Sequence, residues 1–134
     1  MFSLLIALGL LLMLAVRFLR EVPDVRHKQG CNRGALGTMR SALSVYYGDM
    51  AGRYPDQLDS LLKDRKYLDS IPDIWVCPDQ NLHPATHEVV LRSSLVPQDS
   101  GKIGYVNGPG GPDRGAVFID CTHTDSKGTA WAAY

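Results

Sequence analysis

The beginning of the chain is almost entirely apolar. Ser3 and Gly9 interrupt the run only slightly, and no charged side chain occurs before Arg17. A helix of sixteen to nineteen residues rises roughly 24–29 Å, close to the ~30 Å thickness of the hydrocarbon core of a bilayer. The pattern predicts a membrane-spanning helix over residues 1–22, followed by a globular unit over residues 23–134.

Three interpretations of this apolar segment compete. A cleaved signal peptide begins with basic residues and ends in a small-x-small site, but here no basic residue precedes Arg17 and no A-x-A follows the run. A buried core helix would show a polar face, which residues 4–16 lack. A retained anchor is favoured. The basic residues that follow the span, Arg17, Arg20 and Arg26 among them, would by the positive-inside rule place the globular unit in the cytoplasm.

A second, amphipathic pattern covers residues 27–51. Its apolar residues recur every three or four positions, which places them on one face of a helix; they are Leu36, Met39, Leu43, Tyr46, Tyr47 and Met50. Pro23 is expected to kink or end the preceding apolar helix because it lacks an N–H group. Gly52 suits the position just after the helix, and Arg53 is expected to bond the last carbonyl groups.

The remaining residues predict a short helix and several strands. Residues 56–62 form the predicted helix, with Asp56 as its cap. Strands are expected at residues 87–92, 103–106 and 116–120, with a weaker one at 129–133 after a turn at 125–128 and a possible short one at 75–77. The predicted fold is α+β: a long N-terminal helix, half apolar and half amphipathic, packed on a small antiparallel sheet of about three to four strands.

The distribution of charge and the positions of the cysteines limit the classes of function that fit the sequence. The 14 basic and 14 acidic residues are well mixed, so no basic stripe indicates a nucleic-acid partner. The three cysteines, Cys31, Cys77 and Cys121, have no metal-binding spacing. In an oxidising compartment one pair could form a disulfide. The sequence leaves the pairing open, and we favour Cys77 with Cys121 because both fall where we expect sheet.

Two groups of residues invite a chemical interpretation. Asp120, His123 and Asp125 are the most metal-like set, but residues 120 and 125 would not share a face of a strand. Ordering of a hairpin by polar side chains explains them better. Cys121 with His123 resembles a thiol nucleophile and its base, yet no oxyanion donor is evident. We therefore expect no enzyme activity, no metal and no cofactor, and keep a metal- or thiol-dependent hydrolase as a minor alternative.

Several stretches resemble the type IV pilin and type II secretion pseudopilin family. The start Phe2-Ser-Leu-Leu resembles the family's Phe-Thr-Leu-Ile, and the spacing from Phe2 to Pro23 matches its phenylalanine and helix-kinking proline. Residues 36–49, 52–55 and 66–72 look like the region where the pilin helix enters its globular head. Residues 104–107 and 117–128 resemble the closing sheet of major-pseudopilin-like proteins.

This resemblance implies a structural subunit of a type II secretion pseudopilus or of a type IV pilus-like filament. The implied partners are copies of itself or other pilins, an inner-membrane assembly platform and the lipid bilayer. The implied location is the bacterial inner membrane, crossed once, with the globular unit in the periplasm or on an extracellular filament. The filament and membrane helix would use seven residues: Phe2, Leu5, Ile6, Leu8, Leu12, Val16 and Pro23.

Two positions depart from the family pattern. The family carries a basic leader ending in glycine before its phenylalanine, where this sequence has only Met1. Such a leader would also hold the N-terminus inside and remove the conflict with the positive-inside rule. The family has a glutamate where this chain has Ile6, which leaves major or minor status open. The family's acidic calcium loop is not clearly matched. A membrane-anchored periplasmic binding or adaptor domain that does not polymerise is the alternative function.

Overall fold

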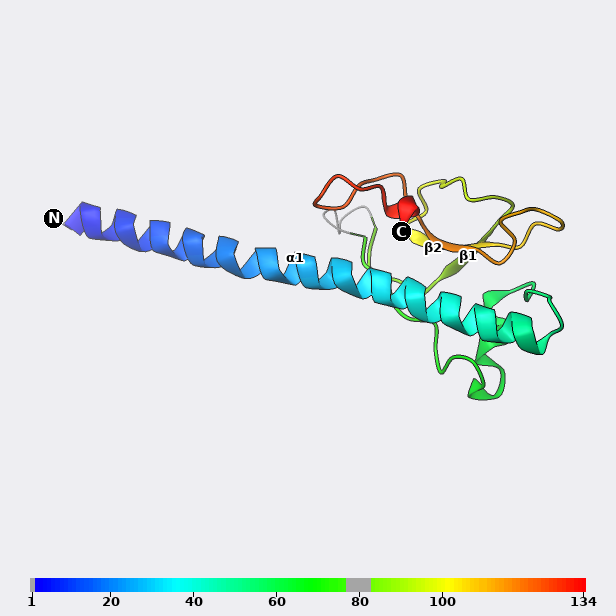
Figure 1. Ribbon diagram of the computed structural model, residues 1–134. Helices are drawn as coiled ribbons and strands as arrows, with labels where there is room; N and C mark the ends of the chain where they lie inside the picture. The colour runs from blue at the N-terminus through cyan, green and yellow to red at the C-terminus, as the bar shows by residue number, and fades with distance from the viewer. Residues whose placement is uncertain (1, 77–82) are drawn as a thin grey trace.

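One long helix and a small mixed sheet make up the computed structural model, which describes residues 2–76 and 83–134. Figure 1 shows the globular part beside the C-terminal half of the helix, whose N-terminal half projects away from it. The elements, in chain order, are helix α1 (Phe2–Asp49), 3-10 helix η1 (Leu58–Arg65), strands β1 (Val89–Arg92), β2 (Lys102–Val106) and β3 (Val117–Asp120), and 3-10 helix η2 (Trp131–Ala133).

The second half of α1 presents one apolar face to the core. Leu36, Met39 and Leu43 are almost completely buried, at intervals of three and four residues that place them on one side of the helix. They share a single hydrophobic cluster with residues of β2, β3 and η1. The predicted face is therefore confirmed in its central part, while Tyr47 and Met50 near its end are exposed.

The helix continues through Pro23. Of the two outcomes predicted for this proline, an end of the helix is wrong, because α1 is a single element of 48 residues, and a kink stays a prediction. A proline removes one backbone hydrogen bond, and the turns on both sides of it continue the helix. The predicted division into a helical and a globular unit falls between residues 22 and 23, which is inside this helix. The continuous helix does not test whether the two parts are separate units, so the division stays a prediction.

The end of α1 follows the sequence prediction. Gly52 adopts a left-handed conformation, with φ of 81°, and its N–H donates to the carbonyl oxygen of Tyr47 at 2.9 Å. A glycine takes this conformation without steric cost, as helix C-termini require. The Nε atom of Arg53 donates to the carbonyl oxygen of Met50 at 3.3 Å, which confirms the expected role of this arginine.

The sheet has the order β1-β2-β3 and is mixed. β2 and β3 are antiparallel, with Lys102 opposite Asp120, but β1 and β2 are parallel, with Val89 opposite Ile103. The predicted all-antiparallel sheet is wrong at this pair. A short connection between neighbouring strands favours an antiparallel hairpin. Here residues 93–101 instead return the chain to the end of the sheet at which β1 begins, so that β2 runs in the same direction as β1. In this connection Asp99 and Gly101 have positive φ angles of 62° and 69°.

Two predicted local elements are also corrected. The short helix is of the 3-10 type and begins at Leu58 after Gln57, without a side-chain cap; the Asp56 carboxylate instead accepts a hydrogen bond from Arg114 at 2.7 Å. The predicted last strand at 129–133 is mostly η2. Only Ala130 pairs there, with Thr124, and Trp131 turns into the core, where it is fully buried. Burial of this large ring outweighs strand pairing.

Asn32 attaches α1 to the globular part by hydrogen bonds. Its side chain is fully buried. Its amide nitrogen donates to the carbonyl oxygen of Trp75 at 2.6 Å, and its amide oxygen accepts from the N–H of Trp75 at 2.8 Å. The side chain thus satisfies both backbone groups of a residue beside Ile74, which itself pairs with Thr86. A polar side chain in the core is tolerated because its groups are paired.

These findings contradict the predicted fold class and location. The protein is a small α+β structure, but the described residues do not show a long apolar N-terminal helix packed on an antiparallel sheet. The part of α1 that shares the core is the amphipathic stretch near residues 32–43, and the sheet is mixed. Within residues 2–76 and 83–134, no helix combines the length and the apolar character needed to cross a bilayer. The predicted single-pass inner-membrane location is therefore wrong.

Replacing Asn32 by alanine tests its role in the attachment of α1. The change removes the partners of the N–H and carbonyl groups of Trp75, which are partly buried, so we expect the free energy of unfolding to fall by about 1–3 kcal/mol. Ser41→Ala, an exposed change on the same helix, should alter it by less than about 0.5 kcal/mol. Equilibrium unfolding in urea measures both variants, and equal losses would contradict the role of Asn32.

Candidate functional site

Four side chains with metal-binding atoms meet at one end of the sheet. They are His83, Asp99, Cys121 and His123, and one ligand atom from each lies within 4.8 Å of the others. We call this set the His/Cys cluster. Sequence analysis had paired Cys121 with His123 because they are two residues apart, but it missed the other two. No spacing signal could have found them, since His83 and Asp99 come from separate loops far from Cys121 in the sequence.

The strand pairing brings these residues together. Because β2 and β3 are antiparallel, the residues that precede β2 and those that follow β3 lie at the same end of the sheet. Asp99 comes just before β2, and Cys121 directly follows β3. The N–H of Gly101 donates to the carbonyl oxygen of Asp120 at 2.8 Å, which extends this pairing beyond the strands.

Gly101 makes room for the imidazole ring of His83. A Cβ atom built on Gly101 would lie 2.2 Å from Nδ1 of His83, which is far too close for any side chain. Gly101 also has a φ angle of 69°, a conformation that favours glycine. The His83 side chain is only 10% exposed in this position. The backbone therefore admits His83 to the cluster at a point where another residue type would exclude it.

The donor atoms are close to one another. Oδ1 of Asp99 lies 3.3 Å from Nε2 of His83 and 3.2 Å from Nδ1 of His123. Sγ of Cys121 lies 3.3 Å from the same Nδ1 atom of His123. The N–H of Thr122 donates to Oδ1 of Asp99 at 2.9 Å and so fixes the carboxylate. The two imidazole rings are 5.3 Å apart and inclined at 62°.

The environment changes the protonation of two members of the cluster. The hydrogen bond from the backbone N–H of Thr122 is the main cause that lowers the pKa of Asp99 to about 2. Burial raises the pKa of the Cys121 thiol to about 11. A buried thiol of high pKa is a poor nucleophile. The raised pKa therefore argues against covalent catalysis by a free Cys121 thiolate.

The structure does not bring together the predicted metal-like set of Asp120, His123 and Asp125. The side chain of Asp120 lies in the core instead. The Asp120 carboxylate is fully buried and pairs with a guanidinium nitrogen of Arg92 at 2.6 Å. It also accepts hydrogen bonds from the N–H of Gln98 and the hydroxyl of Ser100. Burial by itself would raise the pKa of Asp120, but these hydrogen bonds and the Arg92 charge outweigh it and lower the pKa.

Asp125 orders the turn that follows β3, as the sequence suggested. One of its carboxylate oxygens accepts from the N–H of Lys127 at 2.7 Å and from the N–H of Thr129 at 2.9 Å. The other accepts from the hydroxyl of Tyr134, which is the main cause of the lowered pKa of Asp125. The turn closes at Gly128, whose φ angle is 79°. Asp125 is thus a structural residue of the C-terminal turn.

The residues predicted for the filament helix all lie on α1. The side chains of Ile6, Leu12 and Val16 are exposed. The structure does not describe the side chains of the other four, which are Phe2, Leu5, Leu8 and Pro23. Cys77, the predicted disulfide partner of Cys121, lies outside the described residues, so this pairing stays a prediction.

Exposed apolar side chains gather on the first third of α1. Seven large ones have exposed fractions of 45–74%, and we call them the apolar segment: Ile6, Leu10, Leu11, Leu12, Met13, Leu14 and Val16. An exposed apolar surface of this density is typical of interaction sites. Elsewhere in the described chain the large exposed apolar residues are fewer and fall in residues 45–50 and 91–96.

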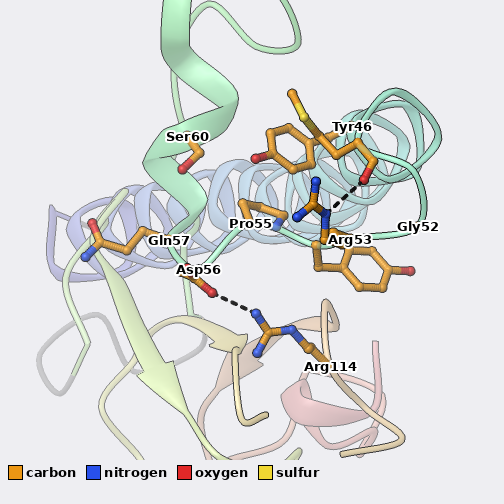
Figure 2. Close-up of a pocket in the computed structure, with 10 residues that line it drawn as sticks. Tyr46, Gly52, Arg53, Pro55, Asp56, Gln57, Ser60 and Arg114 are labelled. Atoms are coloured by element: carbon orange, nitrogen blue, oxygen red, sulfur yellow. Dashed lines mark hydrogen bonds and ion pairs between the residues drawn. The ribbon is translucent and has the colours of Figure 1, made fainter. Parts of the chain in front are cut away.

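A cavity of about 590 Å³ lies at the end of α1. Figure 2 shows it between the helix end, the loop at residues 52–57 and Arg114, which reaches Asp56 across it. Its charged groups already have structural partners, since Arg114 also donates to the carbonyl oxygen of Asn107 and Arg53 caps α1. Nothing in this lining forms a nucleophile and base pair, so the cavity is not a candidate active site.

Comparison of the chain with protein-family models, with curated proteins and with solved structures finds no match.

Two carboxylate ion pairs in the same sheet should differ strongly in their effect on stability. Asp120→Ala leaves the charge of Arg92 buried and unpaired, so we expect a loss of about 3–5 kcal/mol in the free energy of unfolding. Glu88→Ala removes an exposed pair with Lys102, which solvent screens, and should have a much smaller effect. Chemical unfolding measures the difference, and similar losses would contradict the structural role of Asp120.

Proposed function

We propose that this chain is a structural subunit of a filament of the type IV pilin or type II secretion pseudopilin kind. In the filament, the apolar segment packs against the same segment of neighbouring copies, and the globular part covers the outside. The observation that carries this proposal is the exposed apolar segment on a helix whose core-forming part begins only near residue 32.

The geometry of α1 supports contacts with neighbouring chains. Before Asn32 the helix extends for roughly 45 Å, at 1.5 Å per residue. Figure 1 shows this stretch projecting beyond the globular part of its own chain. The apolar side chains at its surface therefore have to be covered by something other than their own globular part.

The distribution of the apolar side chains favours several neighbours over one. Residues 10–14 are consecutive, exposed and apolar, and successive residues of a helix are rotated by roughly 100°. They therefore point to all sides of the helix, and a single groove would cover only part of them. A helix that is apolar all round is suited to the interior of a bundle.

Copies of the same helix are the occupant we propose. Every copy exposes the same apolar surface, and a head-to-tail arrangement that does not close on itself generates a helical filament. Gly9 and Ala15 are small residues at which two helices can approach closely. The resemblance of residues 36–49 and 117–128 to pilin sequences supports the same assembly. Such assembly requires no catalysis by this chain.

Paired cysteines in the apolar segment distinguish a filament from an isolated domain. Leu10→Cys combined with Leu12→Cys provides two exposed attachment points on nearly opposite sides of the helix, so oxidation of assembled subunits should give a ladder of covalent oligomers on a denaturing gel. The unaltered chain, with its own cysteines, is the background control. A single monomer band would contradict the filament and favour the adaptor alternative.

A charge in the apolar segment should abolish assembly and leave the globular part intact. Leu12→Asp places a carboxylate between helices that exclude water, where an unpaired charge is strongly unfavourable. We expect filament yield to fall by at least about tenfold, which corresponds to 1.4 kcal/mol. Val96→Asp is the matched control, because Val96 has a similar exposed fraction, 64% against 68% for Leu12, but lies in the globular part.

Electron microscopy and sedimentation measure the yield, and circular dichroism checks that both variants are folded. Filaments of Leu12→Asp at the level of the unaltered chain would overturn the proposed packing.

A further inference from the structure

We propose that the His/Cys cluster is a structural zinc site, in which His83, Asp99, Cys121 and His123 are the four ligands. The proposal concerns the globular part alone and does not depend on filament assembly. It rests on the types of donor atom, on their separations and on the backbone that holds them.

The donor set has the chemistry of a zinc site. Two imidazole nitrogens, one sulfur and one carboxylate oxygen are the ligand types that Zn²⁺ binds in proteins. Calcium and magnesium prefer all-oxygen sites with six or more ligands, and this cluster offers one carboxylate only. A thiolate together with imidazoles selects a softer divalent ion.

The separations of the donor atoms fit a tetrahedral ion. Zinc bonds of about 2.0–2.3 Å at tetrahedral angles place neighbouring ligand atoms about 3.3–3.7 Å apart. The carboxylate of Asp99 lies 3.3 Å from the His83 nitrogen and 3.2 Å from the His123 nitrogen. The sulfur of Cys121 is 3.3 Å from that same His123 nitrogen. The other pairs of ligand atoms lie within 4.8 Å of one another, so side chains at the wider pairs have to move together when an ion binds.

The surrounding backbone prepares the site before an ion binds. The N–H of Thr122 holds the Asp99 carboxylate at 2.9 Å, an outer contact of the kind that orients metal ligands. Gly101 leaves the space that His83 occupies, and Cys121 is fully buried. Four protein ligands leave no open position for substrate, so the site is of the structural type.

Zinc at this site would join three separate segments of the chain. His83 precedes β1, Asp99 precedes β2, and Cys121 and His123 follow β3. On binding, the Cys121 thiol loses its proton to solvent as the zinc–sulfur bond forms, and no oxidant or reductant is needed. Because the ion binds the folded state, it stabilises the globular part in proportion to the logarithm of its concentration.

Cobalt and zinc titrations of the full chain, prepared without a polyhistidine tag, test the proposal. Co²⁺ should bind with one equivalent per chain and produce both a thiolate-to-metal charge-transfer band and the intense visible bands of a tetrahedral ion. Addition of Zn²⁺ should displace it and remove these bands. Zn²⁺ should also raise the midpoint of thermal unfolding, and a chelator should reverse the rise.

Variants assign the ligands. Cys121→Ser should abolish the charge-transfer band, and His123→Gln should lower the zinc affinity by more than about 100-fold, because even outer-shell changes cost 10- to 100-fold. Gly101→Ala should lower the affinity similarly by displacing His83, without removing any ligand. His87→Gln is the control: this histidine is exposed, pairs with Asp73 and lies outside the cluster, so its replacement should change nothing.

The proposal is overturned if the folded chain binds neither ion at stoichiometric amounts, or if cobalt binds without a charge-transfer band. It is equally overturned if His87→Gln weakens binding as much as His123→Gln does. Should Cys121→Ser fail to fold, the spectrum of the unaltered chain still reports whether sulfur is a ligand, and Gly101→Ala still reports whether His83 is required.

Discussion

The attachment of α1 to the globular part over a short stretch is the constraint on which the rest of the structure depends. Leu36, Met39 and Leu43 enter the shared core, and Asn32 pairs with the backbone of Trp75 at the beginning of this stretch. Burial of these apolar side chains supplies most of the free energy that holds α1 on the globular part. The hydrogen bonds of the Asn32 amide fix the position along α1 at which the contact with the globular part begins. Among the side chains that the structure describes, those of α1 that contact the globular part lie in its second half, and the apolar segment before them is exposed.

The mixed sheet has a consequence for the end of the sheet at which the His/Cys cluster lies. A parallel β1–β2 pair requires residues 93–101 to return along the sheet, and this return places Asp99 and Gly101 beside the residues that follow β3. The buried ion pair between Arg92 at the end of β1 and Asp120 at the end of β3 lies across the same sheet. Strand topology, rather than any local motif, therefore creates the His/Cys cluster and determines which carboxylates are free to join it.

The three acidic residues near this end show how the environment separates their roles. Asp120 is committed to Arg92, and Asp125 to the N–H groups of its own turn. Asp99 instead has its Oδ1 atom directed at two imidazole rings. Each carboxylate has a lowered pKa, yet only Asp99 lies where a cation could be shared with histidine and cysteine.

Local chemistry along the sequence determined several features correctly. The spacing of Leu36, Met39 and Leu43 gave the buried helix face, Gly52 and Arg53 gave the helix end, and the β-branched and aromatic runs gave the positions of β2 and β3. Each of these depends on residues a few positions apart, where periodicity and turn preferences apply. The expected break at Pro23 failed because one lost hydrogen bond did not end a long helix.

Only the tertiary structure decided three features of the protein. They are the parallel direction of β1, the 3-10 helix η2 in place of a last strand, and the meeting of His83 with Asp99, Cys121 and His123. These features depend on contacts between residues far apart in the sequence, whose energies no local pattern contains. The direction in which β1 pairs depends on its neighbouring strand, and the burial of Trp131 depends on the side chains that surround it in the core. The apolar segment was visible in the sequence, but its position outside the protein's own core became apparent only once the globular part was seen on the other half of the helix.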